Sequence, residues 1–155
     1  NLQCNIGYAQ SILDHAEFAL SIFLQHGWEK FPPDCDESIT DLNSEDHCKN
    51  FGGNSLYDIY LSNEGVGMVV PESQYPVNPY TGGYTSFMKI STLLNEYQTL
   101  PSWSNHVIAH ELHHSIQLRY GYSVSGTPGS YMYNGWFFEQ TATYMENVIY
   151  PNIFI

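Results

Sequence analysis

Three stretches of the chain have the apolar spacing or the flanking residues of helices. The first runs from Tyr8 to about Gly27. Its apolar residues recur every three or four positions, and it would bury Ile12, Ala16, Ala19, Leu20 and Phe23. The second runs from Trp103 to about Leu118. The third begins with the aromatic residues at 136–138 and ends before Pro151, because proline cannot continue a helix.

Between the first two helices the pattern changes to the alternation of polar and apolar residues that is typical of strands. Three short segments, 55–62, 65–71 and 84–91, have this pattern and are separated by Gly and Pro turns. A chain of 155 residues with 43% hydrophobic content can bury one ordinary core. We therefore expect residues 1–155 to form one α+β domain, in which a small mixed sheet accompanies the helices.

The charge of the chain excludes some classes of partner. Sixteen acidic residues against four basic ones give a formal net charge of -12, which repels nucleic acid and anionic membrane surfaces. No apolar run approaches the roughly 18 residues that span a bilayer. Residues 1–10 have neither an initiating Met nor the basic and then apolar pattern of a signal peptide. We expect a soluble, already trimmed protein that binds neither nucleic acid nor membrane.

Two of the three cysteines, Cys35 and Cys48, bracket a short polar loop. A disulfide between them would be typical of a secreted protein, and the alternative is a pair of free thiols. Cys4 is left as a free thiol or as the partner of a cysteine outside the chain. The acids of the loop are candidate Ca²⁺ ligands, although the loop lacks EF-hand spacing and simple solvation would also explain it. These acids are Asp34, Asp36, Glu37, Asp41, Glu45 and Asp46.

The stretch 105–117, NHVIAHELHHSIQ, holds four of the seven histidines. On a helix, His110 and His114 project from one face one turn apart, close enough to hold a single metal ion. Glu111 is then turned toward the side on which an attacking water would lie. The alternative interpretation is a polar helix face that happens to be rich in histidine.

A catalytic zinc needs three protein ligands and one open position. The positions that carry Gly and His in metzincins are Gln117 and Tyr120 here, and no His, Cys or Asp follows His114, so that class is excluded. The only acids after the motif are Glu139 and Glu146, which a helix places on one face about 10 Å apart. The spacing alone does not choose between them.

Position along the chain favours Glu139 as the third ligand. Glu139 lies in the first turns after a predicted break at Gly135, where the aromatic residues 136–138 would anchor the helix against the core. Glu146 would then be either a surface acid or an acid that orients a ligand histidine through the free nitrogen of its ring.

The segments HELHH and WFFEQTATYME resemble the gluzincin metallopeptidases, whose second zinc helix often reads Trp, two residues, Glu, a small residue, Ala and another Glu. Much of the remaining chain resembles secreted bacterial metallopeptidases, although Gln140 stands where those families usually carry Gly. The resemblance implies a secreted, zincin-like protein in which His110, His114 and Glu139 hold Zn²⁺. Gluzincins continue into a further subdomain, so it also implies a missing C-terminal segment or a partner chain.

Such a site would hydrolyse peptide bonds in a protein or peptide substrate. Zinc would polarise the scissile carbonyl, and Glu111 would take a proton from the water and pass it to the leaving amine. By resemblance to zincins, 84–91 would be the edge strand that pairs with the substrate, although it is equally well explained as plain sheet structure. The candidates for stabilising the oxyanion are Tyr120, Tyr122, Tyr131 and Tyr133.

The rival interpretation is a non-catalytic, secreted zinc-binding or structural module that retains the zincin fold. The presence of Glu111 argues against this module, because a domain that only holds zinc needs no base beside its first ligand. The end of the chain soon after Glu146 argues for it.

Overall fold

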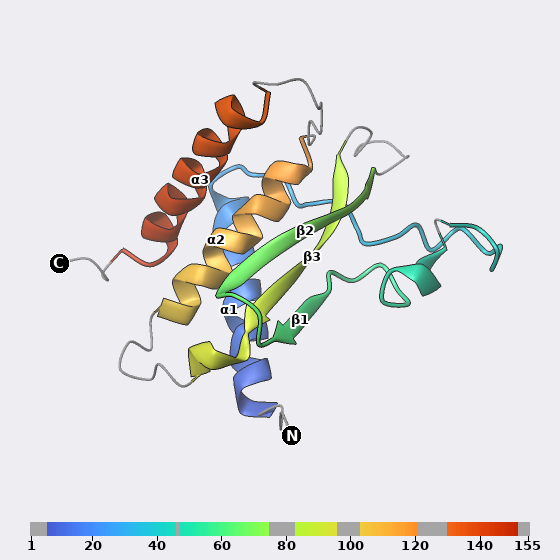
Figure 1. Ribbon diagram of the computed structural model, residues 1–155, viewed down its shortest axis with the longest axis horizontal. Coiled ribbons are helices and arrows are strands. Elements are labelled where there is room, and N and C mark those ends of the chain that lie inside the picture. The colour runs from blue at the N-terminus through green and yellow to red at the C-terminus, as the bar shows by residue number, and fades with distance from the viewer. Residues whose placement is uncertain (1–5, 46, 75–82, 96–102, 121–129, 152–155) are drawn as a thin grey trace.

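The computed structural model describes residues 6–45, 47–74, 83–95, 103–120 and 130–151, with only the backbone of Asn95 and of 130–134. In this part of the chain the fold is α+β, with three helices and a three-stranded mixed sheet (Figure 1). The elements are α1 (Ile6–Gln25), β1 (Ile59–Ser62), β2 (Gly67–Gln74), β3 (Tyr84–Ser91), α2 (Trp103–Leu118) and α3 (Ser130–Ile149). Short 3-10 turns cover Cys48–Asn50 and Thr92–Asn95.

The strand order of the sheet is β1-β3-β2, with β1 parallel and β2 antiparallel to β3. The expectation that 84–91 is an edge strand is therefore wrong, because it has a hydrogen-bonded neighbour on each side. Met88 and Ile90 of β3 are fully buried, as expected for a central strand. Among the strands that the structure describes, the edges are β1 and β2. Pro71 lies in β2, which fits an edge position because proline has no N–H to donate to a second neighbour.

Helix α2 lies between the other two helices and the sheet (Figure 1). Its buried apolar residues pack into one core with the face of α1 that the sequence predicted. Ile12, Ala16, Ala19 and Phe23 of α1 are buried and Leu20 is partly buried, so that prediction is confirmed. Each fully buried large apolar side chain contributes about 1.5–3 kcal/mol relative to exposure, which makes this packing the main support of α2.

Helix α3 differs from its prediction at its start. It begins at Ser130, so the predicted break at Gly135 is wrong and Gly135 lies inside the helix. A glycine inside a helix costs only about 1 kcal/mol, which the rest of α3 can offset. Trp136 and Phe137 are 56% and 54% exposed, so they do not anchor the helix against the core. Instead, among the described side chains of α3, those of residues 135–149, the buried ones are Ala142, Met145 and Ile149.

The other predicted boundaries are partly right. The strand at 84–91 and the end of α3 before Pro151 are confirmed. The first strand is limited to Ile59–Ser62, and the second is shifted to Gly67–Gln74. Residue 55 is not in a strand because its backbone N–H and hydroxyl donate to the carboxylate of Glu37.

The acidic loop is closed by a disulfide between Cys35 and Cys48, so of the two alternatives the bridge is confirmed. Asp36 and Asp41 accept hydrogen bonds from the backbone N–H two residues later, at Ser38 and Asn43. Within the described residues, no three acids of this loop lie close enough to hold one cation. The Ca²⁺ site remains a prediction, and Cys4 and Asp46 lie outside the described residues.

None of the helices in the described ranges is both long enough and apolar enough to cross a membrane.

His113 is fully buried on α2 between the rings of Phe23 and Trp28, and neither of its ring nitrogens has a hydrogen-bond partner among the described residues. Burial, followed by the charges of His114 and His110, lowers the pKa of His113 to about 3. The unfolded chain, with a histidine pKa near about 6.5, therefore binds this proton more readily. The stability that neutral His113 contributes is fully present above about pH 6.5 and is lost as the pH falls toward about 3.

We predict that His113→Leu raises the free energy of unfolding by about 1–3 kcal/mol at neutral pH, because it removes an unsatisfied buried polar group. The gain should grow between about pH 7.5 and about pH 5, since leucine cannot titrate. Urea unfolding of both proteins in EDTA measures this difference. A variant less stable than the wild type at both pH values would contradict the prediction.

Candidate metal centre

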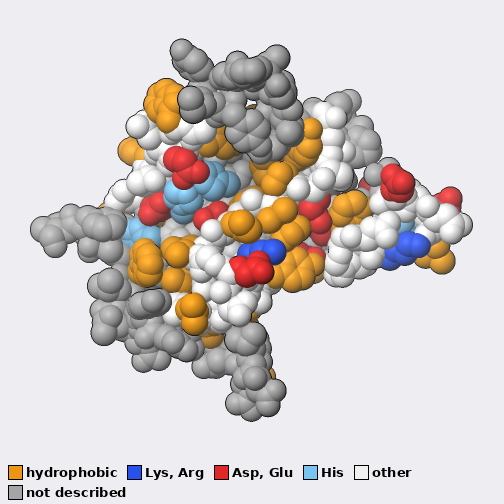
Figure 2. Space-filling view, viewed as in Figure 1, with side chains coloured by type: hydrophobic (Ala, Val, Ile, Leu, Met, Phe, Trp, Pro, Cys, Tyr) orange, Lys and Arg blue, Asp and Glu red, His pale blue; other side chains and the backbone are white. Residues whose placement is uncertain are grey.

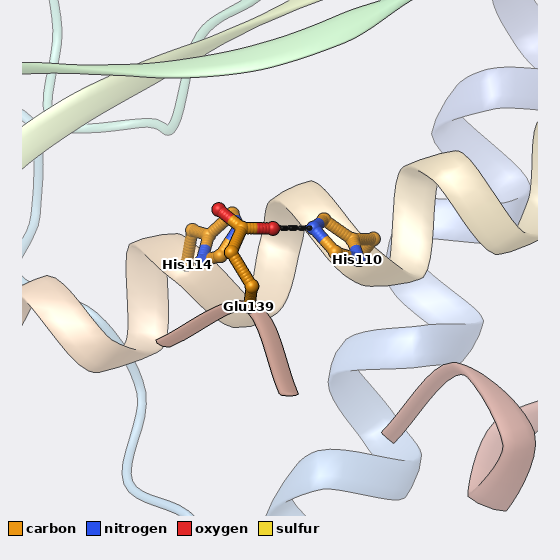
Figure 3. A group of neighbouring side chains, drawn as sticks. All are labelled: His110, His114 and Glu139. Carbon is orange, nitrogen blue, oxygen red and sulfur yellow. Dashed lines mark hydrogen bonds and ion pairs between the residues drawn. The ribbon is translucent and has the colours of Figure 1, made fainter. Parts of the chain in front are cut away.

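The three predicted ligands lie together, with two imidazoles from α2 and one carboxylate from α3 (Figure 3). Nε2 of His110 is 3.0 Å from Nε2 of His114. The same Nε2 of His110 is 3.1 Å from Oε2 of Glu139. Oε1 of Glu139 is 3.6 Å from Nε2 of His114. The donor atoms of the three residues all lie within 4.8 Å of one another.

These distances can be compared with what a metal ion requires. Zinc binds nitrogen and carboxylate oxygen at about 2.0–2.2 Å, and the ligands of a tetrahedron with that radius lie about 3.3 Å apart. The two separations from Nε2 of His110, 3.0 and 3.1 Å, lie slightly below this value, and the 3.6 Å separation from Nε2 of His114 lies above it and involves the other oxygen of Glu139. The residues therefore fit a small divalent ion, and imidazole with carboxylate suits zinc and several neighbouring first-row metals.

The Nδ1 atoms of both histidines are engaged by other side chains. Glu146 of α3 accepts a hydrogen bond from Nδ1 of His110. Oε1 of Gln117 lies 2.7 Å from Nδ1 of His114. Since a carboxylate and an amide oxygen only accept, Nδ1 of each histidine carries a proton, and a metal ion bound between the Nε2 atoms would replace the proton that Nε2 of His110 shares with Glu139. A proton on Nδ1 is what a histidine that binds a metal through Nε2 needs.

Gln117 also links the two helices of the site. Its Nε2 donates to the backbone oxygen of Phe138 at 3.1 Å and to Oγ1 of Thr141 at 2.5 Å. The Phe138 ring stacks on His114 with centroids 6.4 Å apart. Gln117 thereby holds His114 and α3 in one arrangement. The spacing of three residues from His114 places Gln117 on the same face and could have indicated it from the sequence.

Glu146 occupies the outer position that the sequence predicted for it. Its other oxygen, Oε2, lies 3.5 Å from Nδ1 of His106, one turn before His110. The Glu146 side chain is 15% exposed, whereas that of Glu139 is 65% exposed. Burial lowers the pKa of His110, but the hydrogen bond and charge of Glu146, with the charges of Glu111 and Glu139, outweigh it and raise the pKa.

The side chain of Glu111 lies against strand β2. The backbone N–H of Val69 donates a hydrogen bond to its carboxylate. Burial raises the pKa of Glu111 to about 7, against the opposing effect of His110 and with a further contribution from Glu139. A carboxyl group with a pKa near neutrality is suited to accept and return a proton.

A pocket of about 200 Å³ adjoins the centre and shares His110 and Glu111 with it. The remaining lining comes from Val66, Gly67, Trp103, His106, Val107 and Glu146. Figure 2 shows the histidines as a pale-blue patch over α2, bordered by acidic side chains and reachable from solvent. The pocket residues at 66, 67, 103 and 107 were not identified from the sequence, because only the folded chain brings β2 to α2.

Of the four tyrosines that are candidates for stabilising the oxyanion, only Tyr120 has its side chain among the described residues. Tyr120 is 61% exposed, with its ring 5.9 Å from the guanidinium of Arg119. Tyr122 and the side chains of Tyr131 and Tyr133 lie outside the described residues.

A family model described as "Family of unknown function (DUF6055)" matches residues 78–154, just under half of the chain. The matched segment contains β3, α2 and α3, and therefore all the candidate ligands and Glu111. The description assigns no activity. No significant match to the chain was found among curated proteins or among solved structures.

The geometry predicts an order of zinc affinities. Glu139→Ala should weaken binding most, because Glu139 faces the Nε2 atoms of both histidines. Glu146→Ala and Gln117→Leu should each cost the roughly 10- to 100-fold typical of residues that orient a ligand. Competition with a chromophoric chelator measures the three affinities. A larger loss for Glu146→Ala than for Glu139→Ala would move the third ligand to Glu146.

The pKa of Glu111 predicts a pH-dependent cost in stability. Its folded pKa of about 7 lies above the unfolded value of about 4.3, so its contribution is fully present below about pH 4 and is lost as the pH rises through about 7. Glu111→Gln cannot ionise. We compare the free energy of unfolding of Glu111→Gln with that of the wild type at two pH values. The difference in favour of the variant should be larger at about pH 8 than at about pH 4, by roughly 2–3 kcal/mol. Denaturant unfolding in EDTA tests this, and a pH-independent difference would refute it.

Proposed function

We propose that this protein is a secreted zinc peptidase of the zincin type, in which His110, His114 and Glu139 hold the metal and Glu111 is the general base. The observation that carries the proposal is the convergence of donor atoms from two histidines and a glutamate, all within 4.8 Å of one another, beside a pocket that also contains the partly buried Glu111. A site that only held a metal would not require that glutamate. The disulfide between Cys35 and Cys48 supports secretion, since disulfides persist in oxidising compartments.

The chemistry divides between the metal and the chain. A zinc ion bound at the centre would polarise a scissile carbonyl and lower the pKa of a nearby water molecule. Glu111 would take a proton from the attacking water and deliver it to the leaving amine, so that the peptide C–N bond breaks and two shorter peptides result. Glu146 and Gln117 would hold the two imidazoles in their tautomers throughout.

The strand order favours β2 over β3 as the strand that a substrate would pair with. β2 is an edge strand whose backbone passes next to Glu111, whereas β3 is paired on both sides. An extended peptide added along β2 would lie over the metal centre. The Val69 N–H is engaged by Glu111, so the peptide would bond to backbone groups on either side of Val69.

The adjoining pocket would take a substrate side chain next to the scissile bond. Val66, Trp103 and Val107 give it apolar walls, and its volume of about 200 Å³ suits one side chain of the size of leucine or phenylalanine. We therefore propose peptides with an apolar residue at this position as the substrate class.

The proposal predicts that Glu111→Gln retains stoichiometric zinc and loses hydrolysis by about 10²- to 10⁴-fold, the range typical of general acid–base catalysis. Zinc content is measured by mass spectrometry of the metal, and cleavage is measured on a mixture of unstructured peptides. Glu17→Gln, at an exposed position on α1, is the matched control and should keep both properties.

Two outcomes would contradict the proposal. Full activity of Glu111→Gln would exclude Glu111 as the base. A wild-type protein that binds zinc and cleaves none of the peptides would instead support the non-catalytic module.

A further inference from the structure

Strand β2 begins at Gly67, which lies directly against α2. A Cβ atom placed on Gly67 would be 2.6 Å from Cγ1 of Val107, 3.0 Å from Cγ of Glu111 and 3.2 Å from Oε1 of Glu111. The first distance is too short for any side chain, and the other two are tighter than most real contacts. Two of the three crowded atoms belong to the proposed base.

The backbone conformation does not explain the glycine. The glycines with positive φ are Gly27, Gly52, Gly53 and Gly65, and Gly67 is not among them. Any residue could adopt its extended conformation, so what position 67 requires is the lack of a side chain. A glycine inside a strand marks a close approach of the backbone to another group, and here that group is Glu111.

The next contact along the same strand involves the same carboxylate. Val69, two residues after Gly67, donates its backbone N–H to Glu111. The carboxylate is therefore held by the strand at one place and approached by it without a side chain at another. If β2 were pushed away from α2 at residue 67, the Val69 N–H would be withdrawn from Glu111 as well.

We propose that Gly67 is a positioning residue for Glu111: its missing side chain lets the backbone of β2 come close enough to fix the carboxylate facing the metal centre. The inference rests on the proposed function, in which Glu111 is the base. Its specific content is that strand β2, and not helix α2 alone, sets where the proton is taken and returned.

The test compares Gly67→Ala with Gly135→Ala. Gly135 also lacks a positive φ, and a Cβ placed on it would have none of the described atoms within 4 Å, so the control adds the same methyl group without crowding against them. Gly67→Ala should bind zinc within about threefold of the wild type, because the ligands come from α2 and α3. Its kcat for peptide cleavage should fall by about 10- to 100-fold, as expected for a base displaced by a fraction of an ångström to one ångström. KM should change as well, because Gly67 lines the proposed substrate pocket, so kcat at saturating peptide is the readout.

A second pair of variants separates the base from simple crowding. In the Val107→Ala background the closest contact of the new methyl group is removed, while the two contacts with Glu111 remain. The double variant should therefore be as stable as Val107→Ala alone, but its kcat should still be lower than that of Val107→Ala. Recovery of kcat in the double variant would overturn the inference, because the loss would then have come from Val107. This pair also serves if Gly67→Ala alone does not fold.

A readout independent of activity keeps the inference separate from the proposed function. Amide hydrogen exchange at Val69, followed by NMR, should become roughly tenfold faster or more in Gly67→Ala and should stay unchanged in Gly135→Ala. Unchanged exchange at Val69 in Gly67→Ala would refute the inference even if activity fell. If the wild type cleaves no peptide, the proposed function fails, and the exchange rate alone decides whether Gly67 sets the place of Glu111.

Discussion

Two histidines on one helix face are held in position to bind a single metal ion when the Nδ1 atom of each ring is hydrogen-bonded to another side chain. Here that condition is met by Glu146 at His110 and by Gln117 at His114. An imidazole without such a partner is free to rotate and to change tautomer. The hydrogen bonds at the Nδ1 atoms are therefore the constraint on which the candidate centre depends.

This constraint determines how α3 must dock on α2. Glu139 has to reach the Nε2 side of His110, and Glu146, two turns later, has to reach its Nδ1 side. Both contacts exist together only in one register of the two helices. The buried residues Ala142 and Met145 lie between the two acids in sequence and fix that register by packing, while Gln117 fixes it by bonding to the backbone of Phe138. Apolar packing and polar contacts thus specify the same arrangement.

Sequence patterns predicted the parts of the fold that depend on local spacing. The apolar face of α1 was recovered because a single stripe at helical period meets a single core. The pair His110 and His114 was predicted correctly because residues four positions apart on a helix project from the same face. Strand order has no such local signature, and β3 was placed at the edge although it is central.

Other features could not be read locally. Trp136 and Phe137 are exposed because apolar residues are not confined to the interior, so an aromatic run does not by itself identify a buried face. The first turn of α3 resembled a loop in composition, and docking on α2 outweighs the cost of Gly135. The role of Gly67 depends on a strand that lies about forty residues before Glu111 in sequence, and only the fold brings the two together.

The electrostatics of the centre follow from the composition of the whole chain. In a protein with sixteen acids and four bases, three glutamates surround two imidazoles, and no lysine or arginine is among the groups that shift the pKa values of His110, Glu111 and His114. At His110 burial is outweighed by the hydrogen bond of Glu146 and the charges of the glutamates, which raise the pKa, so positive charge is favoured there, whereas burial lowers the pKa of His114. A proton and a divalent cation both carry positive charge, and they compete for Nε2 of His110. Metal affinity must therefore fall as the pH decreases and His110 protonates, so the acids that attract a metal ion to the site also make its retention depend on pH.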